Sequence, residues 1–168
     1  MDTQTLRSNQ APLKERYRSD PESAHTPVQA TADFRDDGIT CSVESWAGPI
    51  RAGLHRATGG DGSDACSADM LMDALVGCAG VTLRSVATAL GLDIRSASLR
   101  ADAMFDARGT LGVDREAEVG IQNVVVTAVV DTDADDKALE RLARSTERYC
   151  VVAKSLRAPV EFVVRRAD

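Results

Sequence analysis

Large aromatic side chains are scarce in this sequence: Phe, Tyr and Trp together make up 4% of its 168 residues. Aromatic rings supply much of the buried area of small cores, so one domain of this length has limited means of covering a long apolar element. Histidine occurs only twice, and the four cysteines show neither a C-x-x-C motif nor a Cys/His spacing typical of zinc. The sequence therefore predicts no metal site and no bound cofactor.

A surplus of basic residues is also missing, since the net charge is −6 at pH 7 and the pI is about 5.0. Nucleic acid or an anionic membrane would require a basic face, so we expect small molecules or proteins as partners. Residues 1–7 lack the basic start and apolar stretch of a secretory signal, and Asp73 and Arg84 interrupt the longest apolar region, near residues 70–92. These features predict a cytoplasmic protein without a membrane span, in surroundings that disfavour permanent disulfides.

The chain divides into a polar arm and one domain. Residues 1–27 contain three prolines and show no sustained hydrophobic period, which is typical of an arm that is mobile or lies on another surface. Residues 28–168 are long enough for one core and too short for two. We therefore predict a single domain over residues 28–168.

Three strands are predicted in the first part of this domain. Ile39, Cys41 and Val43 alternate with polar residues after a turn at residues 36–38 that joins two strands, and residues 50–54 form the third. The following run, residues 57–63, is rich in glycine but lacks the lysine and hydroxyl of a phosphate-binding loop. We interpret it as a connecting loop.

A long helix is predicted next, with Ser67 as its N-cap and its end at Gly91. At 1.5 Å per residue it would span about 35 Å. Apolar residues occupy nearly its whole circumference. Such a helix must be covered on several sides.

The second half of the chain is predicted to contain a hairpin of strands at residues 96–105 and 119–130, a helix capped by Asp133, and a last strand at residues 160–164. One face of that helix carries Ala138, Leu139, Leu142, Thr146, Tyr149 and Cys150. The predicted fold class is therefore α+β, with antiparallel sheets wrapped around a long central apolar helix. Because one copy has little with which to bury that helix, a homodimer sharing the central helices is favoured.

Two cysteines, Cys78 and Cys150, lie on the apolar faces of the two predicted helices. A thiol at a packed position is either an inert small hydrophobe or, if a partner stabilises its thiolate, a redox nucleophile. Cys78 lies about three turns inside its helix, too far from the end for the helix dipole to act on it. A reactive Cys78 therefore needs a nearby cation or base. Taken singly, each cysteine is more often a packing residue.

The remaining candidates are weaker. Cys66 precedes the predicted start of the long helix and is best placed for its dipole, so it is a rival reactive thiol. Cys41 lies on the inner face of a strand and is expected in the core. His55 enters the glycine-rich loop, where histidines are most often solvated. Asp69 and Asp73 lie in the first two turns of the helix, where negative charge is favoured in any case.

Three segments follow one another along the chain: residues 68–83 (ADMLMDALVGCAGVTL), 108–112 (RGTLG) and 149–152 (YCVV). In this order they resemble the OsmC/Ohr family of thiol-dependent peroxidases. The likeness runs from about Val28 to Phe162, and the paired-cysteine pattern carries it. What the resemblance implies is an OsmC-like fold in an intertwined homodimer with its sites at the subunit interface.

The resemblance also implies a chemistry for the two cysteines. Cys78 would attack an organic hydroperoxide, and its sulfenic acid would condense with Cys150. A dithiol reductant, either a lipoyl protein or a small thiol, would then reduce the disulfide. The implied biological role is defence against oxidative stress.

The sequence departs from the family pattern at the start of the long helix and beside the second cysteine. Family peroxidases carry a glutamate where Ala68 stands, and Asp69, one residue later, is a hypothetical support for catalysis. They also carry an upstream arginine that holds the thiolate, for which Arg51 and Arg56 both lie in the right region. Val151 follows the second cysteine where the family often has proline.

Two other functions stay open at this level. A ligand-binding or redox-sensing protein would keep the OsmC-like scaffold without turnover and hold an apolar ligand between subunits, which Ala68 in place of glutamate favours. A hot-dog-like thioesterase would also wrap a long apolar helix with sheet. It would need a carboxylate base and would retain activity without the two cysteines.

Overall fold

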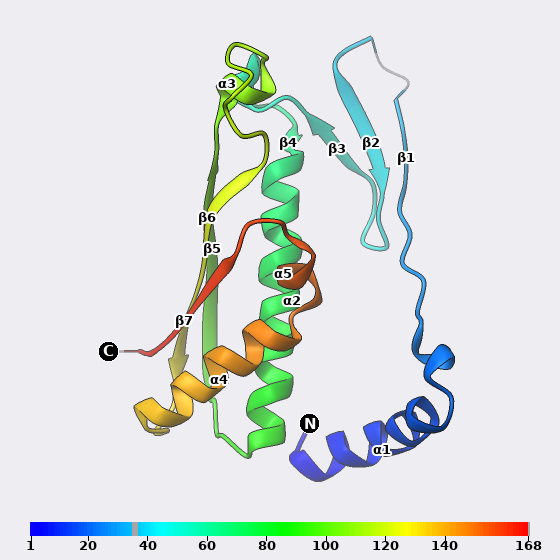
Figure 1. Ribbon diagram of the computed structural model, residues 1–168, viewed down its shortest axis with the longest axis vertical. Helices are drawn as coiled ribbons and strands as arrows, with labels where there is room; N and C mark the ends of the chain where they lie inside the picture. The colour runs from blue at the N-terminus through cyan, green and yellow to red at the C-terminus, as the bar shows by residue number, and fades with distance from the viewer. Residues whose placement is uncertain (35–36, 168) are drawn as a thin grey trace.

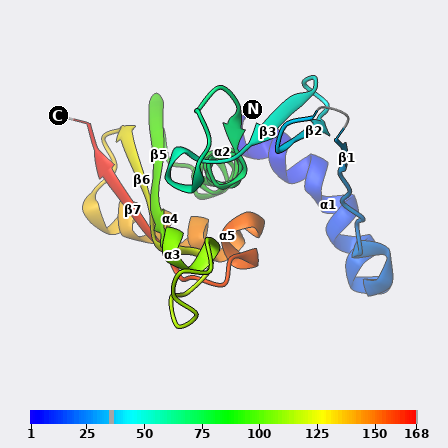
Figure 2. The same ribbon diagram turned by 90° about the horizontal axis from the view of Figure 1, so that it is seen from above.

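The computed structural model describes residues 1–34 and 37–167. A long helix, α2 (Ser67–Leu90), runs through the middle of the molecule and has one sheet on either side (Figure 1). The strands form a four-stranded sheet of order β1-β2-β3-β4 and a three-stranded sheet of order β5-β6-β7. Seen from above, the two sheets lie on opposite sides of α2 (Figure 2). The predicted α+β arrangement around a central helix is confirmed.

The N-terminal sheet consists of β1 (Thr31–Asp33), β2 (Thr40–Glu44), β3 (Ile50–Gly53) and β4 (Ala65–Cys66). The first three strands pair antiparallel, as predicted, whereas β4 pairs parallel to β3. The turn predicted at residues 36–38 falls partly outside the described residues, because Asp36 is not among them. The glycine-rich loop contains a short 3₁₀ helix, η2 (Arg56–Thr58).

Helix α2 has the predicted length but begins differently. It ends at Gly91, whose φ of 69° is the left-handed conformation that glycine adopts without strain. At the other end Cys66, and not Ser67, is the N-cap, and no side chain in the described part of the chain caps the helix. The reason is that Cys66 keeps the extended conformation of β4, so Ser67 is already helical. The fully buried positions form one stripe: Leu75, Ala79, Leu83 and Ala87.

The C-terminal sheet consists of β5 (Ser96–Phe105), β6 (Ile121–Asp131) and β7 (Val160–Arg166). The predicted hairpin of β5 and β6 is confirmed, and the short helix α3 (Ala107–Thr110) lies in its connection. β7 pairs parallel to β6, so both sheets are mixed and not antiparallel throughout. The helices α4 (Asp136–Tyr149) and α5 (Val151–Ser155) form a long crossover from β6 to β7, which is what parallel pairing requires.

Two details of α4 correct the sequence prediction. Its N-cap is Asp135, whose carboxylate accepts the N–H of Ala138 at 2.7 Å. Asp133, the predicted cap, instead pairs with Arg95, with an Nη1 to Oδ2 distance of 2.7 Å. Tyr149, predicted on the apolar face, is mostly exposed and lies under the guanidinium of Arg148.

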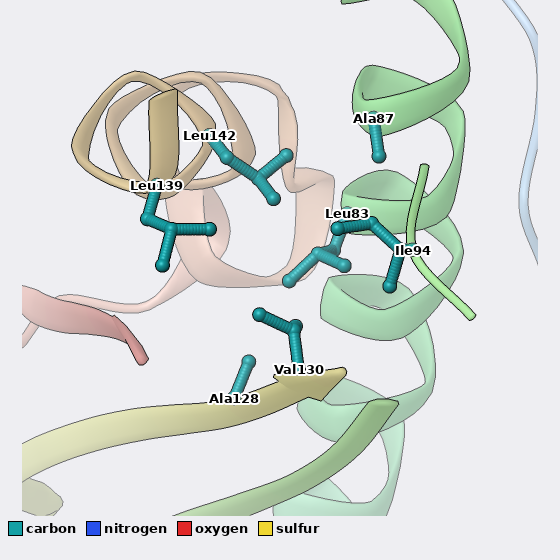
Figure 3. Packing of buried hydrophobic residues seen from close by; sticks show 7 residues of the cluster. All are labelled: Leu83, Ala87, Ile94, Ala128, Val130, Leu139 and Leu142. Atoms are coloured by element: carbon teal, nitrogen blue, oxygen red, sulfur yellow. The ribbon is translucent and has the colours of Figure 1, made fainter. Parts of the chain in front are cut away.

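The core lies between α2, α4 and the three-stranded sheet. One cluster of seven buried apolar residues is shown in Figure 3: Leu83, Ala87, Ile94, Ala128, Val130, Leu139 and Leu142. A second cluster continues toward the start of α2 and includes Leu75, Ala79, Val124 and Cys150. Full burial of each leucine contributes about 1.5–3 kcal/mol, so these clusters hold α4 and the sheet against one side of α2.

The rest of α2 and the N-terminal sheet leave apolar side chains uncovered. Val81 on α2 is 73% exposed, and Trp46, between β2 and β3, is fully exposed. By length and composition α2 is also apolar enough to cross a membrane, a criterion that the core helices of soluble proteins meet as well. One chain therefore covers its central helix incompletely.

The N-terminal arm forms a helix, α1 (Thr3–Ser19), followed by the 3₁₀ helix η1 (Pro21–Ala24). The sequence does not predict α1. All of its residues are described and none of them is buried, so its sequence shows no hydrophobic period. Asp2 caps it by accepting the N–H of Thr5 at 2.7 Å. The hydroxyl of Thr3 donates to the carbonyl of Thr88 at 2.8 Å and holds the start of the arm against α2.

Candidate active site

Cys78 and Cys150 lie together in the second core cluster. Cys78 is half-buried on α2 beside the fully buried Ala79, and Cys150 is fully buried. All four cysteines of the chain, each within the described ranges, are free thiols in this structure. The fold thus brings into contact two thiols that are separated by 72 residues (150 − 78) along the chain.

A break in the helical backbone at Cys150 shapes the site. Cys150 has an extended conformation (φ −74°, ψ 105°), so α4 ends at Tyr149 and α5 begins at Val151. The first N–H groups of a helix have no acceptor within the helix. The N–H groups of Val151 and Val152 are therefore available to the Cys78 sulfur.

Hydrogen bonds to the Cys78 sulfur favour its thiolate. Burial acts to raise the pKa of Cys78, but the donors around the sulfur outweigh it, and the pKa lies below the ordinary value of a cysteine. The donors are the backbone N–H of Val152, the thiol of Cys150, the hydroxyl of Thr82 and the backbone N–H of Val151. The charge is stabilised here by dipoles, and no cation from the same chain is among these donors.

The pKa of Cys150 is shifted in the opposite direction. Burial raises it first, and the neighbouring Cys78 raises it further, because Cys150 gives up its hydrogen bond to Cys78 when it ionises and then faces a second negative charge. The backbone N–H of Ala153 opposes this only in part. Cys78 is therefore the thiol that ionises first, while Cys150 stays protonated.

Asp69 does not reach Cys78 within one chain. It is exposed in the first turn of α2, nine residues before Cys78. Nine residues correspond to about two and a half turns, which place Asp69 about 13 Å away along the axis and on the opposite side of the helix. The structure of one chain therefore does not bring this predicted support to the thiol pair.

The two candidate arginines lie on different elements. Arg51 is on β3 of the N-terminal sheet, which lies on the side of α2 away from the three-stranded sheet (Figures 1 and 2), whereas Arg56 is in η2, which contacts α3 in the connection between β5 and β6. Arg51 on β3 forms a bidentate pair with Asp64, with distances of 2.6 Å from Nε to Oδ1 and 3.1 Å from Nη2 to Oδ2. The Asp64 side chain is largely buried, so this pair fixes the plane of the guanidinium. Arg56 is exposed in η2, and no ion pair within the described part of the chain orients it.

Cys66 and His55, the other candidates, meet at a pocket of about 250 Å³ beside the start of α2. Ala68 and Phe105 also line it, and the ring of His55 packs edge-on against Phe105 with 5.3 Å between centroids. The Nδ1 of His55 accepts the N–H of Ala57 at 3.0 Å. The pocket is mainly apolar. Cys41, which the sequence predicts in the core, lies outside this pocket and is half-buried on β2 of the N-terminal sheet.

Sequence reasoning missed several groups that act on Cys78. Thr82 follows Cys78 by four residues, and this spacing on a predicted helix was a usable signal. The N–H groups of Val151 and Val152 carried no such signal, because they depend on the helix break at Cys150. Asp64 lies at the end of the glycine-rich loop, and only the pairing of β3 with β4 brings it to Arg51.

The fold and the thiol pair define a class of small α+β proteins built around one long apolar helix that carries a cysteine. A family model described as OsmC-like protein matches residues 60–165, which is more than half of the chain. The chain belongs to the OsmC-like protein family. The resemblance indicated by residues 68–83, 108–112 and 149–152 is thereby confirmed.

Solved structures with the same fold support this assignment. An OsmC-like protein of unknown function from Vibrio cholerae is 13% identical, with a TM-score of 0.68 over 83% of this chain and 99% of that one. The organic hydroperoxide resistance protein OsmC from Legionella pneumophila is 16% identical, with a TM-score of 0.65 over 86% of this chain and 100% of that one. An organic hydroperoxide resistance protein from Elizabethkingia anophelis is 14% identical, with a TM-score of 0.66 over 86% of this chain and 98% of that one.

At these identities the likeness to solved structures establishes the fold. No curated protein sequence is significantly similar to the chain.

Proposed function

We propose that this protein is a thiol-dependent peroxidase that reduces organic hydroperoxides in oxidative-stress defence in the cytoplasm. The observation that carries the proposal is the contact between Cys78 and Cys150, in which the pKa of the first thiol is lowered and that of the second is raised. A peroxidase of this kind needs one thiolate to attack and a second thiol within reach, which gives up its proton to the leaving hydroxide when it resolves the sulfenic acid. Two structurally similar proteins are organic hydroperoxide resistance proteins, which supports this reading.

The proposed reaction proceeds in three steps. The Cys78 thiolate attacks the terminal oxygen of the hydroperoxide, the O–O bond breaks, and the alkoxide takes a proton to leave as an alcohol. Cys78 is then a sulfenic acid. The sulfur of Cys150 displaces its hydroxyl, so that a disulfide forms and water is released. A dithiol, such as a lipoyl protein, returns two electrons and two protons by thiol–disulfide exchange.

The active unit in this proposal is a homodimer. One chain leaves Val81 on α2 and Trp46 in the turn between β2 and β3 exposed, and apolar surface of this kind marks an interface. A second copy would cover the open side of α2 with its own N-terminal sheet. In that arrangement Arg51, already oriented by Asp64, is the arginine that supports the partner's thiolate, and its guanidinium adds the cation that the Cys78 site of one chain lacks.

Turnover of cumene hydroperoxide with dihydrolipoamide as the reductant tests the proposal. We expect Cys78→Ser to abolish turnover, and Cys150→Ser to stop after one equivalent, leaving a sulfenic acid on Cys78 that dimedone traps for mass spectrometry. Cys41→Ser is the matched control, since that thiol lies in the N-terminal sheet, and should retain turnover. The proposal fails if a mild dose of hydroperoxide leaves the Cys78 thiol unmodified.

A second candidate function is the binding of an apolar ligand without turnover. The pocket lined by Ala68, His55 and Phe105 favours it, because it is a mainly apolar volume of about 250 Å³ beside the position of the missing glutamate. Calorimetric titration with cumyl alcohol separates the two functions. Binding by wild-type protein that shows no turnover would support the ligand-binding function. No carboxylate lines this pocket within the described part of the chain, so nothing favours a thioesterase there.

A further inference from the structure

Thr82 lies one helical turn after Cys78 on α2. We propose that Thr82 is a positioning residue for the thiol chemistry, whose hydroxyl donates a hydrogen bond to the Cys78 sulfur and keeps the negative charge on Cys78 and not on Cys150. This inference rests on the proposed peroxidase function, in which Cys78 is the attacking thiol.

The first observation is the position of the side chain. Helix α2 is continuous from Ser67 to Leu90, so residues four apart lie on the same face. Cys78 and Val86 lie four residues before and four residues after Thr82. Cys78 packs against the second core cluster, and Val86 packs against the first. Thr82 lies between them on the same stripe and is half-buried. Its side chain therefore lies on the face of α2 that carries Cys78 and is partly covered.

The second observation is that the Thr82 hydroxyl has no oxygen acceptor. Helical threonines often donate to the carbonyl four residues earlier. Thr88 on the same helix does this, with 2.8 Å from its hydroxyl to the carbonyl of Arg84. Among the described residues no hydrogen bond from Thr82 to an oxygen is formed, so its hydrogen is available to the sulfur. The hydroxyl accordingly acts to lower the pKa of Cys78.

The third observation is the absence of a charged partner around Cys78 in the described part of one chain. Cys150 is the titratable group in contact with it. On α4 and α5, Glu147 and Lys154 pair with each other at 2.8 Å, and Arg148 lies over the ring of Tyr149. Within its own chain the Cys78 thiolate is therefore stabilised by dipoles, and the loss of one donor removes a share of that stabilisation.

Alkylation of Cys78 by iodoacetamide, followed across pH by peptide mass spectrometry, tests the inference on the full-length protein. Thr82→Val replaces the hydroxyl with a methyl group of similar size. We expect it to move the pH midpoint of Cys78 alkylation upward by about one unit and to slow the reaction at neutral pH about tenfold. Thr82→Ser keeps the donor and should restore both values, which a merely structural role for Thr82 would not produce.

Thr146→Val is the matched control. Thr146 lies one turn before Cys150 on α4, is fully buried, and its hydroxyl has no hydrogen-bond partner among the described residues. The same chemical change at this position should leave the alkylation profile of Cys78 unchanged. A shift with Thr146→Val equal to that with Thr82→Val would overturn the inference.

An alkylation profile of Thr82→Val that coincides with that of the wild type would also overturn it, provided that circular dichroism shows the variant to be folded. If Thr82→Val does not fold, Thr82→Ala takes its place with the same expected shift. Because alkylation requires no hydroperoxide, the two proposals fail separately. A shifted profile in a protein without turnover would uphold the role of Thr82 and overturn the peroxidase.

Discussion

Cys150 lies against Cys78 in the second core cluster, and its thiol acts as a donor that lowers the pKa of Cys78. Burial acts to raise the pKa of both thiols, but this contact acts on them in opposite directions, lowering the pKa of Cys78 and raising that of Cys150. The pair is thereby divided into a thiol that ionises readily and one that keeps its proton. Such a division selects Cys78 as the sulfur that attacks first and leaves Cys150 to resolve the sulfenic acid.

The order of ionisation predicts a pH dependence. A thiol whose pKa is lowered loses its proton at lower pH, so alkylation of Cys78 by iodoacetamide should reach its midpoint below the pKa of an ordinary cysteine thiol. The midpoint of Cys150 should lie above that value. Peptide mass spectrometry after timed labelling across pH measures both. Labelling of Cys150 before Cys78 would contradict the prediction.

Removal of the Cys150 thiol should weaken the Cys78 thiolate. Cys150→Ala deletes a donor to the Cys78 sulfur, so the midpoint of Cys78 alkylation should move upward. Cys150→Ser retains an O–H donor at the same position and should shift the midpoint less. The same labelling experiment distinguishes the variants, and identical midpoints for alanine and serine would show that the contact does not depend on hydrogen bonding.

A proline at position 151 should also raise the pKa of Cys78. The N–H of Val151 is one of the donors to its sulfur, and proline has none. Val151 is the first residue of α5, a position where proline is well tolerated, so Val151→Pro should leave the fold intact. Val151→Ala keeps the N–H and serves as the control. Equal alkylation profiles for the two variants would exclude this backbone group from the site.

The two arginines that the sequence could not distinguish should behave differently. Arg51→Lys breaks the bidentate pair with Asp64 and should slow hydroperoxide reduction about tenfold, since lysine cannot reproduce the planar fork. Arg56→Lys, which breaks no ion pair within the described residues, should change the rate little. Stopped-flow measurement of the reaction with cumene hydroperoxide compares them. The opposite order of rates would assign the supporting role to Arg56.

The fully buried hydroxyl of Thr146 should lower the free energy of unfolding. It has no hydrogen-bond partner among the described residues, and an unsatisfied buried hydroxyl costs about 1–3 kcal/mol. Thr146→Val should therefore raise the free energy of unfolding by about 1 kcal/mol in urea denaturation. Leu142→Ala, in the adjacent core, should lower it by about 2–5 kcal/mol. A decrease for Thr146→Val would indicate that the hydroxyl is satisfied in solution.

Most of the elements could be predicted because their signals are local. The apolar circumference between Ser67 and Gly91 predicted α2 nearly to the residue, and the β-branched run before Asp131 predicted β6. The helix α1 could not be predicted in this way, since a helix that buries nothing has no hydrophobic period. The caps were misplaced by one or two residues, because acceptors such as Asp133 and Asp135 are equally suitable in sequence.

The sequence by itself determined the central helix, the hairpin and, through the family pattern, the choice of Cys78 and Cys150 as a pair. These follow from hydrophobic period and residue order, which the linear chain contains. Only the tertiary structure decided what else surrounds the Cys78 sulfur beyond its helical neighbour Thr82: the amides exposed by the helix break at Cys150, and no cation from the same chain among its donors. These amides belong to a segment far from Cys78 in the sequence and act over distances of a few ångströms, which packing sets.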